Sequence, residues 1–229
     1  MSEAGAALKS AGEIRRPTQE QIDACKKFNT TIVSDTLDEL GMHGTMLDLK
    51  PIIAGKVLVG PAVTVKERRV IPNPTKLRLA EAMDKCQPGD VLVIDAGSDP
   101  YAGTWGGLVT LRAQLRRIAG VLVDGAARDI SEIREYGFPC WSKFVTPISA
   151  VKRLATLEIN ATVQCGEVIV QPGDMIIADD DGCCCVPFDR LDEVIEKATK
   201  AYEWEQKVLA ELKQGLQGLQ SESLKERIV

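Results

Sequence analysis

The chain has 229 residues, which is enough for one well-buried core and fits a single domain. Apolar residues make up 45% and charged residues 27%, the balance of an ordinary globular protein. The formal net charge of −5 argues against a basic nucleic-acid-binding surface, and no apolar run is long enough for a membrane span. We therefore expect no nucleic-acid partner and no membrane partner.

The seven cysteines are the second compositional clue. They include no Cys-x-x-Cys motif, and His43 is the only histidine that could join them in a metal site. Cys183, Cys184 and Cys185 are adjacent, so in a strand they would point to alternate faces and could not line one pocket. We expect small buried side chains in a reducing compartment, and hence a cytoplasmic protein.

Apolar periodicity, together with Gly, Pro and Asp at the boundaries, predicts the order of the elements. In chain order these are one or two helices over 17–41, a strand over 56–65, a helix over 76–85, a strand over 91–95, a helix over 106–117, a strand over 120–124, a helix over 130–136, four strands over 162–165, 167–170, 175–179 and 182–186, and a helix from Asp189 to about 210. Ser34 is a candidate helix cap, and Gly41 a candidate stop. Gly60-Pro61 predicts a bend in its strand.

The order of these elements favours an α/β fold. Helices and strands alternate first and strands dominate later, and the central strands are apolar without clean alternation, which indicates burial on both faces. The sequence therefore predicts one layered domain over residues 17–212, with an N-terminal tail over 1–16 and a C-terminal tail over 213–229.

The most informative stretch begins at Gly106-Gly107, a glycine pair that opens a helix. Backbone N–H groups of Gly107, Leu108 and Val109 at the start of that helix could bind a ligand carboxylate or an enolate oxygen. Alternatively, the two glycines only permit a tight entry into the helix; we give the structural and the ligand-binding interpretation equal weight.

Arg128 and Asp129 follow the apolar strand that ends at Asp124. The planar guanidinium of Arg128 suits a bidentate carboxylate, and the Asp129 carboxylate suits Mg²⁺ or Mn²⁺. A 2-keto acid would be held well by this set, which suggests metal-assisted cleavage of a carbon–carbon bond. Alternatively, Arg128 and Asp129 form a structural ion pair.

Four other features have a structural explanation that we weigh beside a functional one. Asp124 either lines the site or caps the next turn, with equal weight. For His43, surface placement is favoured over catalysis, and for Asp179–Asp181 a solvated turn is favoured. Trp105 is expected to pack rather than to stack on a ligand.

The run VLVDGAARDISEIREYGFPCW resembles the Gly-x-x-x-(Asp/Asn)-Gly-x-x-Arg-Asp block of the RraA-like family. That family includes class II 4-hydroxy-4-methyl-2-oxoglutarate aldolases and regulators of ribonuclease E activity. SDTLDELG, GPAVTV, PGDVLVIDAG and PGDMIIADDDGCCCVP also resemble family blocks, so the resemblance covers about residues 30 to 200. It implies a layered β/β/α fold, similar to a swivelling domain, with N- and C-terminal helices outside. It also implies a homotrimer or homohexamer with sites between subunits.

The resemblance also assigns roles. Arg128 matches the substrate-binding arginine and Asp129 the metal ligand of a lyase that cleaves small 2-oxo or 4-hydroxy-2-oxo diacids to pyruvate. Oxaloacetate decarboxylation is an expected side activity. In the aldolases an acid stands twenty-one positions before the arginine; here that position is Gly107, and Asp99 or a neighbouring subunit's acid is a candidate replacement. This departure leaves open a second function, a non-catalytic regulator that binds an RNA-degradation enzyme.

Overall fold

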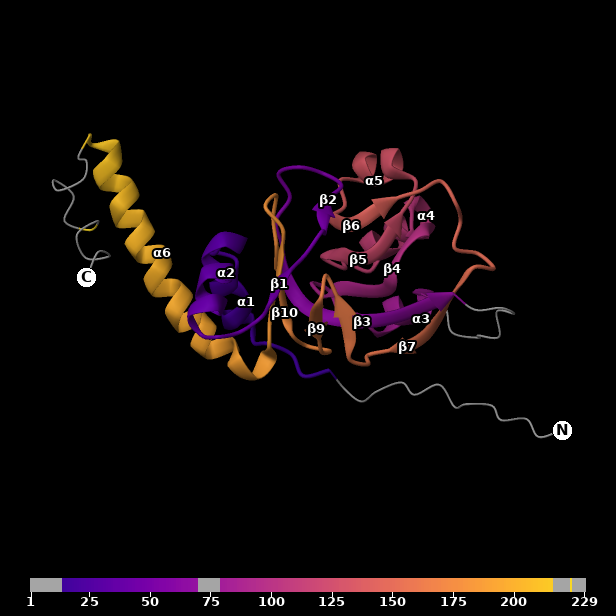
Figure 1. Ribbon diagram of the computed structural model, residues 1–229, viewed down its shortest axis with the longest axis horizontal. Helices are drawn as coiled ribbons and strands as arrows, with labels where there is room; N and C mark the ends of the chain where they lie inside the picture. Colours follow the sequence, from indigo (N-terminus) through magenta and orange to yellow (C-terminus); the bar gives the residue numbers. More distant parts are fainter. Residues whose placement is uncertain (1–13, 70–78, 216–222, 224–229) are drawn as a thin grey trace.

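The computed structural model describes residues 14–69, 79–215 and 223, and shows a layered α/β structure (Figure 1). A parallel sheet lies between helices on one face and a second β layer on the other, and three further helices cover the outside of that second layer. The helices are α1 Gln19–Cys25, α2 Thr30–Glu39, α3 Leu79–Lys85, α4 Gly107–Leu115, α5 Ile130–Tyr136 and α6 Leu191–Lys213. The strands are β1 Thr45–Met46, β2 Lys50–Pro51, β3 Leu58–Arg69, β4 Val91–Trp105, β5 Gly120–Ala127, β6 Cys140–Val145, β7 Leu154–Ile159, β8 Val163–Cys165, β9 Val168–Val170, β10 Met175–Ala178 and β11 Cys183–Val186. The layered β/β/α arrangement with flanking helices is the fold that the sequence predicted.

Four strands run parallel in the order β3-β4-β5-β6. Successive residues of β4 and β5 point to opposite faces, and both faces are buried. Leu92 and Val121 pack toward α3, α4 and α5, whereas Val93 and Leu122 pack toward the second β layer. This double burial is the reason that the strands read as continuous apolar runs.

Strand β3 joins the two β layers. Its first part, Leu58 to Pro61, pairs antiparallel with β10, and its next part, Ala62 to Lys66, pairs parallel with β4. The change of partner falls at Pro61, which has no N–H to donate to a ladder. β3 runs through Gly60-Pro61 without a register shift, so the structure shows there the change of partner at which the parallel sheet begins, and the bend itself stays a prediction.

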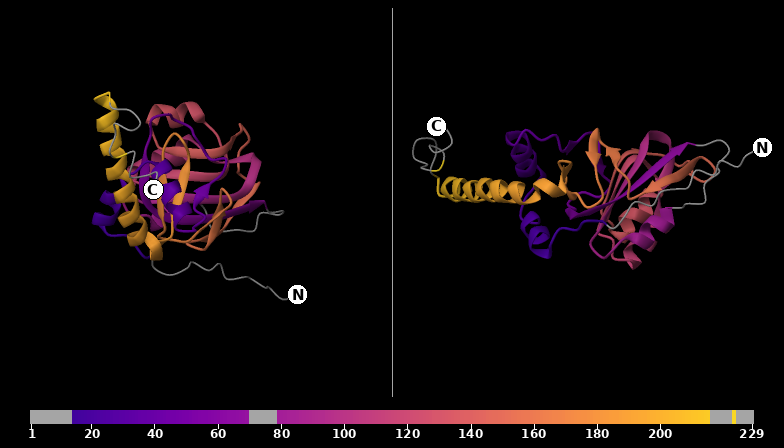
Figure 2. Two further views of the ribbon diagram at one scale, coloured as in Figure 1. Left: turned by 60° about the vertical axis from the view of Figure 1, so that its left-hand side comes forward. Right: turned by 90° about the horizontal axis from the view of Figure 1, so that it is seen from below.

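The outer helices α1, α2 and α6 cover β10 and β11. α1 begins with a capping box at Thr18, and Asn29 caps α2. The first half of α6 packs here, while its second half extends away from the sheets (Figure 2). None of the helices in the described ranges is long and apolar enough to cross a membrane.

Several details differ from the sequence prediction. Ser34 lies inside α2 rather than at a cap, because Asn29 already accepts the Ile32 amide. β4 continues ten residues beyond the predicted end at residue 95, through an irregular stretch that alternation could not indicate. The helix expected over 76–85 is seen from Leu79, and its first three residues lie outside the described ranges.

The three adjacent cysteines are buried, as predicted. Cys183 and Cys185 face the core between the β layers, and Cys184 faces the outer helices. Burial raises the pKa of the Cys184 thiol to about 12, which keeps it protonated and inert. The predicted domain and tail boundaries stay predictions.

Candidate functional site

The candidate site lies where β4 and β5 end on the helix-covered side of the sheet. Because the two strands are parallel, their carboxyl ends meet, and Trp105 is paired with Ala127. The amide of Arg128 donates to the Trp105 carbonyl at 2.8 Å. This pairing places the start of α4, at Gly107, beside the start of α5, at Ile130.

Asp129 occupies the position before α5 in a left-handed conformation, with φ 55°. That conformation is uncommon outside glycine, although Asp tolerates it better than most residues. It turns the carboxylate back to α4, where Oδ2 accepts the Gly107 amide at 3.2 Å. A side chain at Gly106 would collide with the same oxygen, since a Cβ there would lie 2.6 Å from it. Glycine at 106 is therefore required by the approach of Asp129.

Arg128 lies along the same glycine segment. Its aliphatic chain contacts the backbone at Gly103 and Gly106, where a Cβ would lie 3.0 and 3.1 Å from it. Its Nε donates to both oxygens of Asp129 at 3.1 Å, so the two side chains do form an ion pair. The terminal NH1 and NH2 groups donate to no residue in the described ranges, and both side chains are about one-third exposed. The pair is thus fixed at one end and open to a ligand at the other.

Glu132 is the residue that our reasoning from sequence missed. A Cβ at Gly107 would lie 1.6 Å from its Oε2 and 2.6 Å from its Cδ, so the Glu132 carboxylate occupies the space of the side chain that glycine lacks. The signal was present in the sequence: Glu132 follows Asp129 by three residues, one turn into α5, and so lies on the same side of that helix. A carboxylate from α5 therefore lies beside Gly107, the position at which the resemblance expects an acid.

The first turn of α4 supplies the predicted amides. Helix geometry gives the N–H groups of Leu108 and Val109 no carbonyl partner within the helix, so they remain available to a ligand. The buried side of α4 is formed by Gly107, Thr110 and Ala113. Leu108, Leu111 and Leu115, which helical spacing puts on one face of α4, lie on its outer side, and Leu108 is 84% exposed.

Asp99 does not replace the missing acid. Arg69 donates to its carboxylate from Nε and from NH2, and the amide of Tyr101 donates at 2.7 Å. The Arg69 guanidinium holds the pKa of Asp99 below its usual range. With its oxygens occupied in this way, Asp99 has a structural role.

Other candidates also lie apart from the Arg128–Asp129 pair. Asp124 points to the opposite face of the sheet, where it accepts from Ser98 at 2.6 Å. His43 is exposed, as expected, and Trp105 is fully buried in a stack on Phe138. Asp179 is not part of a solvated turn: it accepts from the amide and hydroxyl of Thr30 at the start of α2.

The donor set fits a hard divalent cation. Asp129 and Glu132 offer carboxylate oxygens on the same glycine segment, and Mg²⁺ or Mn²⁺ commonly takes one or two protein carboxylates and fills the remaining positions with water. Within the described ranges no group of three or more His, Cys, Asp or Glu residues could hold a metal. A metal held by Asp129 and Glu132 would therefore have to complete its coordination with water.

The fold and the paired strand ends define an RraA-like α/β protein, and the comparisons agree. Residues 30–185 match the RraA-like family (Aldolase/RraA), and the chain belongs to that family. A Halalkalibacterium halodurans protein provisionally named 4-hydroxy-4-methyl-2-oxoglutarate aldolase is 36% identical over 186 residues, 80% of this chain and 85% of that protein.

Two solved structures share the fold. An uncharacterized Pseudomonas syringae protein is 25% identical with a TM-score of 0.81, over 91% of this chain and 98% of that one. Streptomyces coelicolor RraAS2, described as an unusual member of the RNase ES inhibitor RraA family, is 28% identical with a TM-score of 0.77, over 85% and 98%. The relatives' names thus include both an aldolase and a ribonuclease inhibitor.

Proposed function

We propose that this protein is a divalent-metal-dependent lyase that cleaves a carbon–carbon bond in small 2-oxo or 4-hydroxy-2-oxo diacids and releases pyruvate. The position of Glu132 carries this proposal. Glycine at position 107 would remove an acid from the aldolase site, but the Glu132 carboxylate fills that space from α5. The site keeps its two carboxylates and its arginine, which favours the enzyme over the regulator.

The substrate would be held by groups that this chain already orients. The free NH1 and NH2 groups of Arg128 match the two oxygens of a substrate carboxylate, while Nε stays on Asp129. The amides of Leu108 and Val109 point from a helix start, where a negative charge is stabilised, toward a developing enolate oxygen. Asp129 and Glu132 would hold Mg²⁺ or Mn²⁺, which supplies polarisation of the 2-keto group when bound.

Decarboxylation and retro-aldol cleavage use this arrangement in the same way. In oxaloacetate the bond between C3 and C4 breaks, C4 leaves as carbon dioxide, and the electron pair moves into the C2–C3 enolate. In 4-hydroxy-4-methyl-2-oxoglutarate the same bond breaks as the 4-hydroxyl loses its proton, which gives a second pyruvate. Protonation at C3 completes both reactions, so one enolate-binding site serves both substrates.

A homotrimer or homohexamer with sites between subunits is part of the proposal. Leu108, Leu111 and Leu115 form an outward row on α4, and they are 84%, 42% and 79% exposed. A row of exposed leucines beside a site is typical of a surface that another subunit covers. A second copy on this row would also shield the substrate from water.

The test measures pyruvate through coupled lactate dehydrogenase, with oxaloacetate and with 4-hydroxy-4-methyl-2-oxoglutarate. Activity that needs Mg²⁺ or Mn²⁺ and disappears with a chelator is the expected result, after subtraction of the metal-only rate. If the folded protein binds metal but forms no pyruvate from either diacid, the proposed lyase activity is contradicted. In that case, a stable complex with an RNA-degradation enzyme would favour the regulator.

A further inference from the structure

A polar cavity lies on the side of the parallel sheet that faces the second β layer, and neither Arg128 nor Asp129 lines it. It has a volume of about 470 Å³, within the range of metabolite-binding pockets. None of its lining residues has an apolar side chain: they are His43, Arg68, Asp95, Gly97, Ser98, Asp124, Lys143, Gln164 and Glu167. The β8–β9 hairpin contributes the side opposite the sheet, since β8 contacts β3, β4 and β5. A ligand of this cavity is therefore expected to be hydrophilic.

The floor of the cavity is a row of charges across four neighbouring parallel strands. Arg68 comes from β3, Asp95 from β4, Asp124 from β5 and Lys143 from β6. Asp95 and Asp124 are directly paired in the register of β4 and β5, so two like charges stand side by side with a cation outside each of them. Because a buried ion pair adds little to the stability of the fold, stability alone does not explain why four charged side chains stand in this row.

The two carboxylates have little capacity left for a ligand. Asp95 accepts two bonds from Arg68, at 2.7 and 2.9 Å, and one each from the amides of Gly97 and Gln164. Asp124 forms an ion pair with Lys143 at 3.1 Å and accepts hydrogen bonds from Ser98 at 2.6 Å and from an amide of the β8–β9 turn at 2.9 Å. Six hydrogen bonds and one ion pair with an ammonium group therefore occupy most of the roughly eight acceptor positions that two carboxylates offer.

The unused capacity belongs to the cations. Lys143 has three N–H groups and donates one hydrogen bond, to Ser98 at 3.0 Å, while its ammonium group pairs with Asp124 and its side chain is only 9% exposed. The Nε of Arg68 donates to no residue in the described ranges, and its NH2 makes one bond, to Asp95. The carboxylates thus hold two cations in fixed positions with free donors, which is how a preorganised anion site is built.

The strained loop at the edge of the cavity supports the same interpretation. Ser98 has φ 53°, an uncommon conformation for a residue with a side chain, and it places Oγ between Asp124 and Lys143. Glu167, at the exposed rim, adds a third carboxylate against two cations. The lining therefore carries one net negative charge with His43 neutral, which disfavours a ligand of high negative charge.

We propose that this cavity binds a small polyhydroxylated monocarboxylate, whose carboxylate contacts Lys143 and Arg68 and whose hydroxyl groups contact Gln164 and Glu167. No residue that lines the cavity belongs to the Arg128–Asp129 site. Binding here therefore does not depend on the proposed lyase activity.

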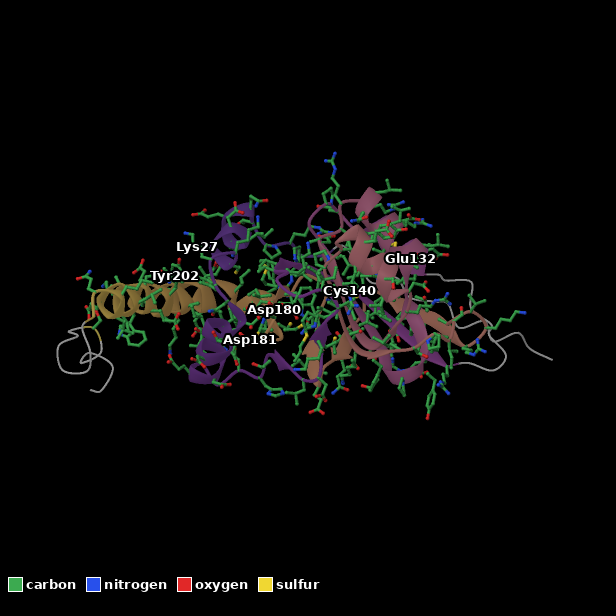
Figure 3. All side chains as sticks on the ribbon, turned by 90° about the horizontal axis from the view of Figure 1, so that it is seen from above. Lys27, Glu132, Cys140, Asp180, Asp181 and Tyr202 are labelled. Atoms are coloured by element: carbon green, nitrogen blue, oxygen red, sulfur yellow. The ribbon has the colours of Figure 1, made fainter. Side chains whose placement is uncertain are left out.

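The experiment titrates the full-length protein by calorimetry in a buffer free of divalent metal and other oxyanions. Gluconate is the probe, sorbitol is the matched polyol without a carboxylate, and inorganic phosphate tests the alternative source of an oxyanion. The double variant Lys143→Met/Asp124→Asn removes the cation without leaving a buried lone carboxylate. Glu167→Gln changes an exposed side chain, and Lys27→Met, an exposed position beside the outer helices, is the control (Figure 3).

We expect saturable gluconate binding that is at least about tenfold weaker in the double variant, since a charged hydrogen bond is lost. Binding should tighten in Glu167→Gln and stay unchanged in Lys27→Met and in Arg128→Ala. The proposal would be overturned if gluconate did not bind, if sorbitol bound equally well, or if phosphate bound more tightly. It would also be overturned if Glu167→Gln did not improve the affinity for gluconate. Loss of binding in Arg128→Ala would assign the ligand to the other site and overturn it as well.

Discussion

The space shared by Gly107 and Glu132 gives the sharpest test of the proposed active site. If one acid is needed there, its origin in the chain should matter less than its position. Glu132→Ala should weaken metal binding and catalysis, and Gly107→Asp should restore both in that background, because the new carboxylate enters the space that Glu132 has left. In the wild-type background Gly107→Asp should not help, since two carboxylates then compete for one place.

The distances set the expected magnitudes. A Cβ at residue 107 would lie 1.6 Å from Oε2 and 3.1 Å from Cβ of Glu132, so the glutamate must rotate away from α4. Glu132 is exposed, and a rotation of this kind costs about 0.5–1.5 kcal/mol, which leaves the fold intact. Loss of a group that supports a bound metal typically lowers affinity about 10- to 100-fold. The coupling energy between the two positions should therefore be about 1.4–2.7 kcal/mol in a double-mutant cycle.

The assay combines kcat/KM for oxaloacetate with the Kd of Mn²⁺, measured by calorimetry on all four proteins. Glu135→Ala is the control, because Glu135 is exposed on the same short helix and should leave both quantities unchanged. Two results would refute the reasoning: full activity and metal affinity in Glu132→Ala, or additive effects of the two substitutions. Either would mean that the carboxylate next to Gly107 takes no part in the site.

Three further predictions address the arginine, the core and the assembly. Arg128→Lys should lower kcat/KM about 10- to 100-fold, since a point charge cannot replace the guanidinium fork. The same change at the exposed Arg134 should have no effect, and equal activity in both variants would mean that Arg128 does not bind the substrate. Burial raises the pKa of the Glu67 carboxyl, so the folded state binds its proton more tightly than the unfolded state. The free energy of unfolding contributed by that proton is lost as the pH rises from the ordinary glutamate pKa through the raised pKa of the folded state. Urea unfolding across this range should show a steeper decline with pH for the wild type than for Glu67→Gln, and parallel curves would contradict the assignment. Light scattering should give the mass of a trimer or hexamer, and Leu115→Glu should lower it; a monomeric wild type would exclude a shared-cleft site.

Local patterns predicted much of the fold because they reflect forces within each segment. The helix over 130–136 was placed correctly, since Gly137 at φ 64° ends it in the way that glycine commonly does. The short strands of the second β layer were also found from their apolar runs. β6 and β7 were missed, because part of each is exposed and their place is fixed by pairing with distant strands.

The candidate site was predicted in part for the same reason. Arg128 and Asp129 belong to the family motif, the glycine pair opens the helix before it, and the structure does bring them together. Glu132 was overlooked because its partner, Gly107, lies twenty-five positions earlier, and only the parallel pairing of β4 with β5 joins them. Helical spacing puts the leucines of α4 on one face, but periodicity does not show what covers such a face, and in the structure it points outward.

The alternation of side chains along the parallel strands explains how one sheet edge supports two polar regions. Where the regular pairing of β4 with β5 ends, Asp95 and Asp124 point toward the second β layer, while the residues that follow carry the chain to Gly107 and Arg128, next to the starts of α4 and α5. The two regions are built on the same strands but have no lining residue in common. Ligands at the two places would therefore be bound by different side chains, and any coupling between them would have to pass through the irregular end of β4, which connects Asp95 to Gly106.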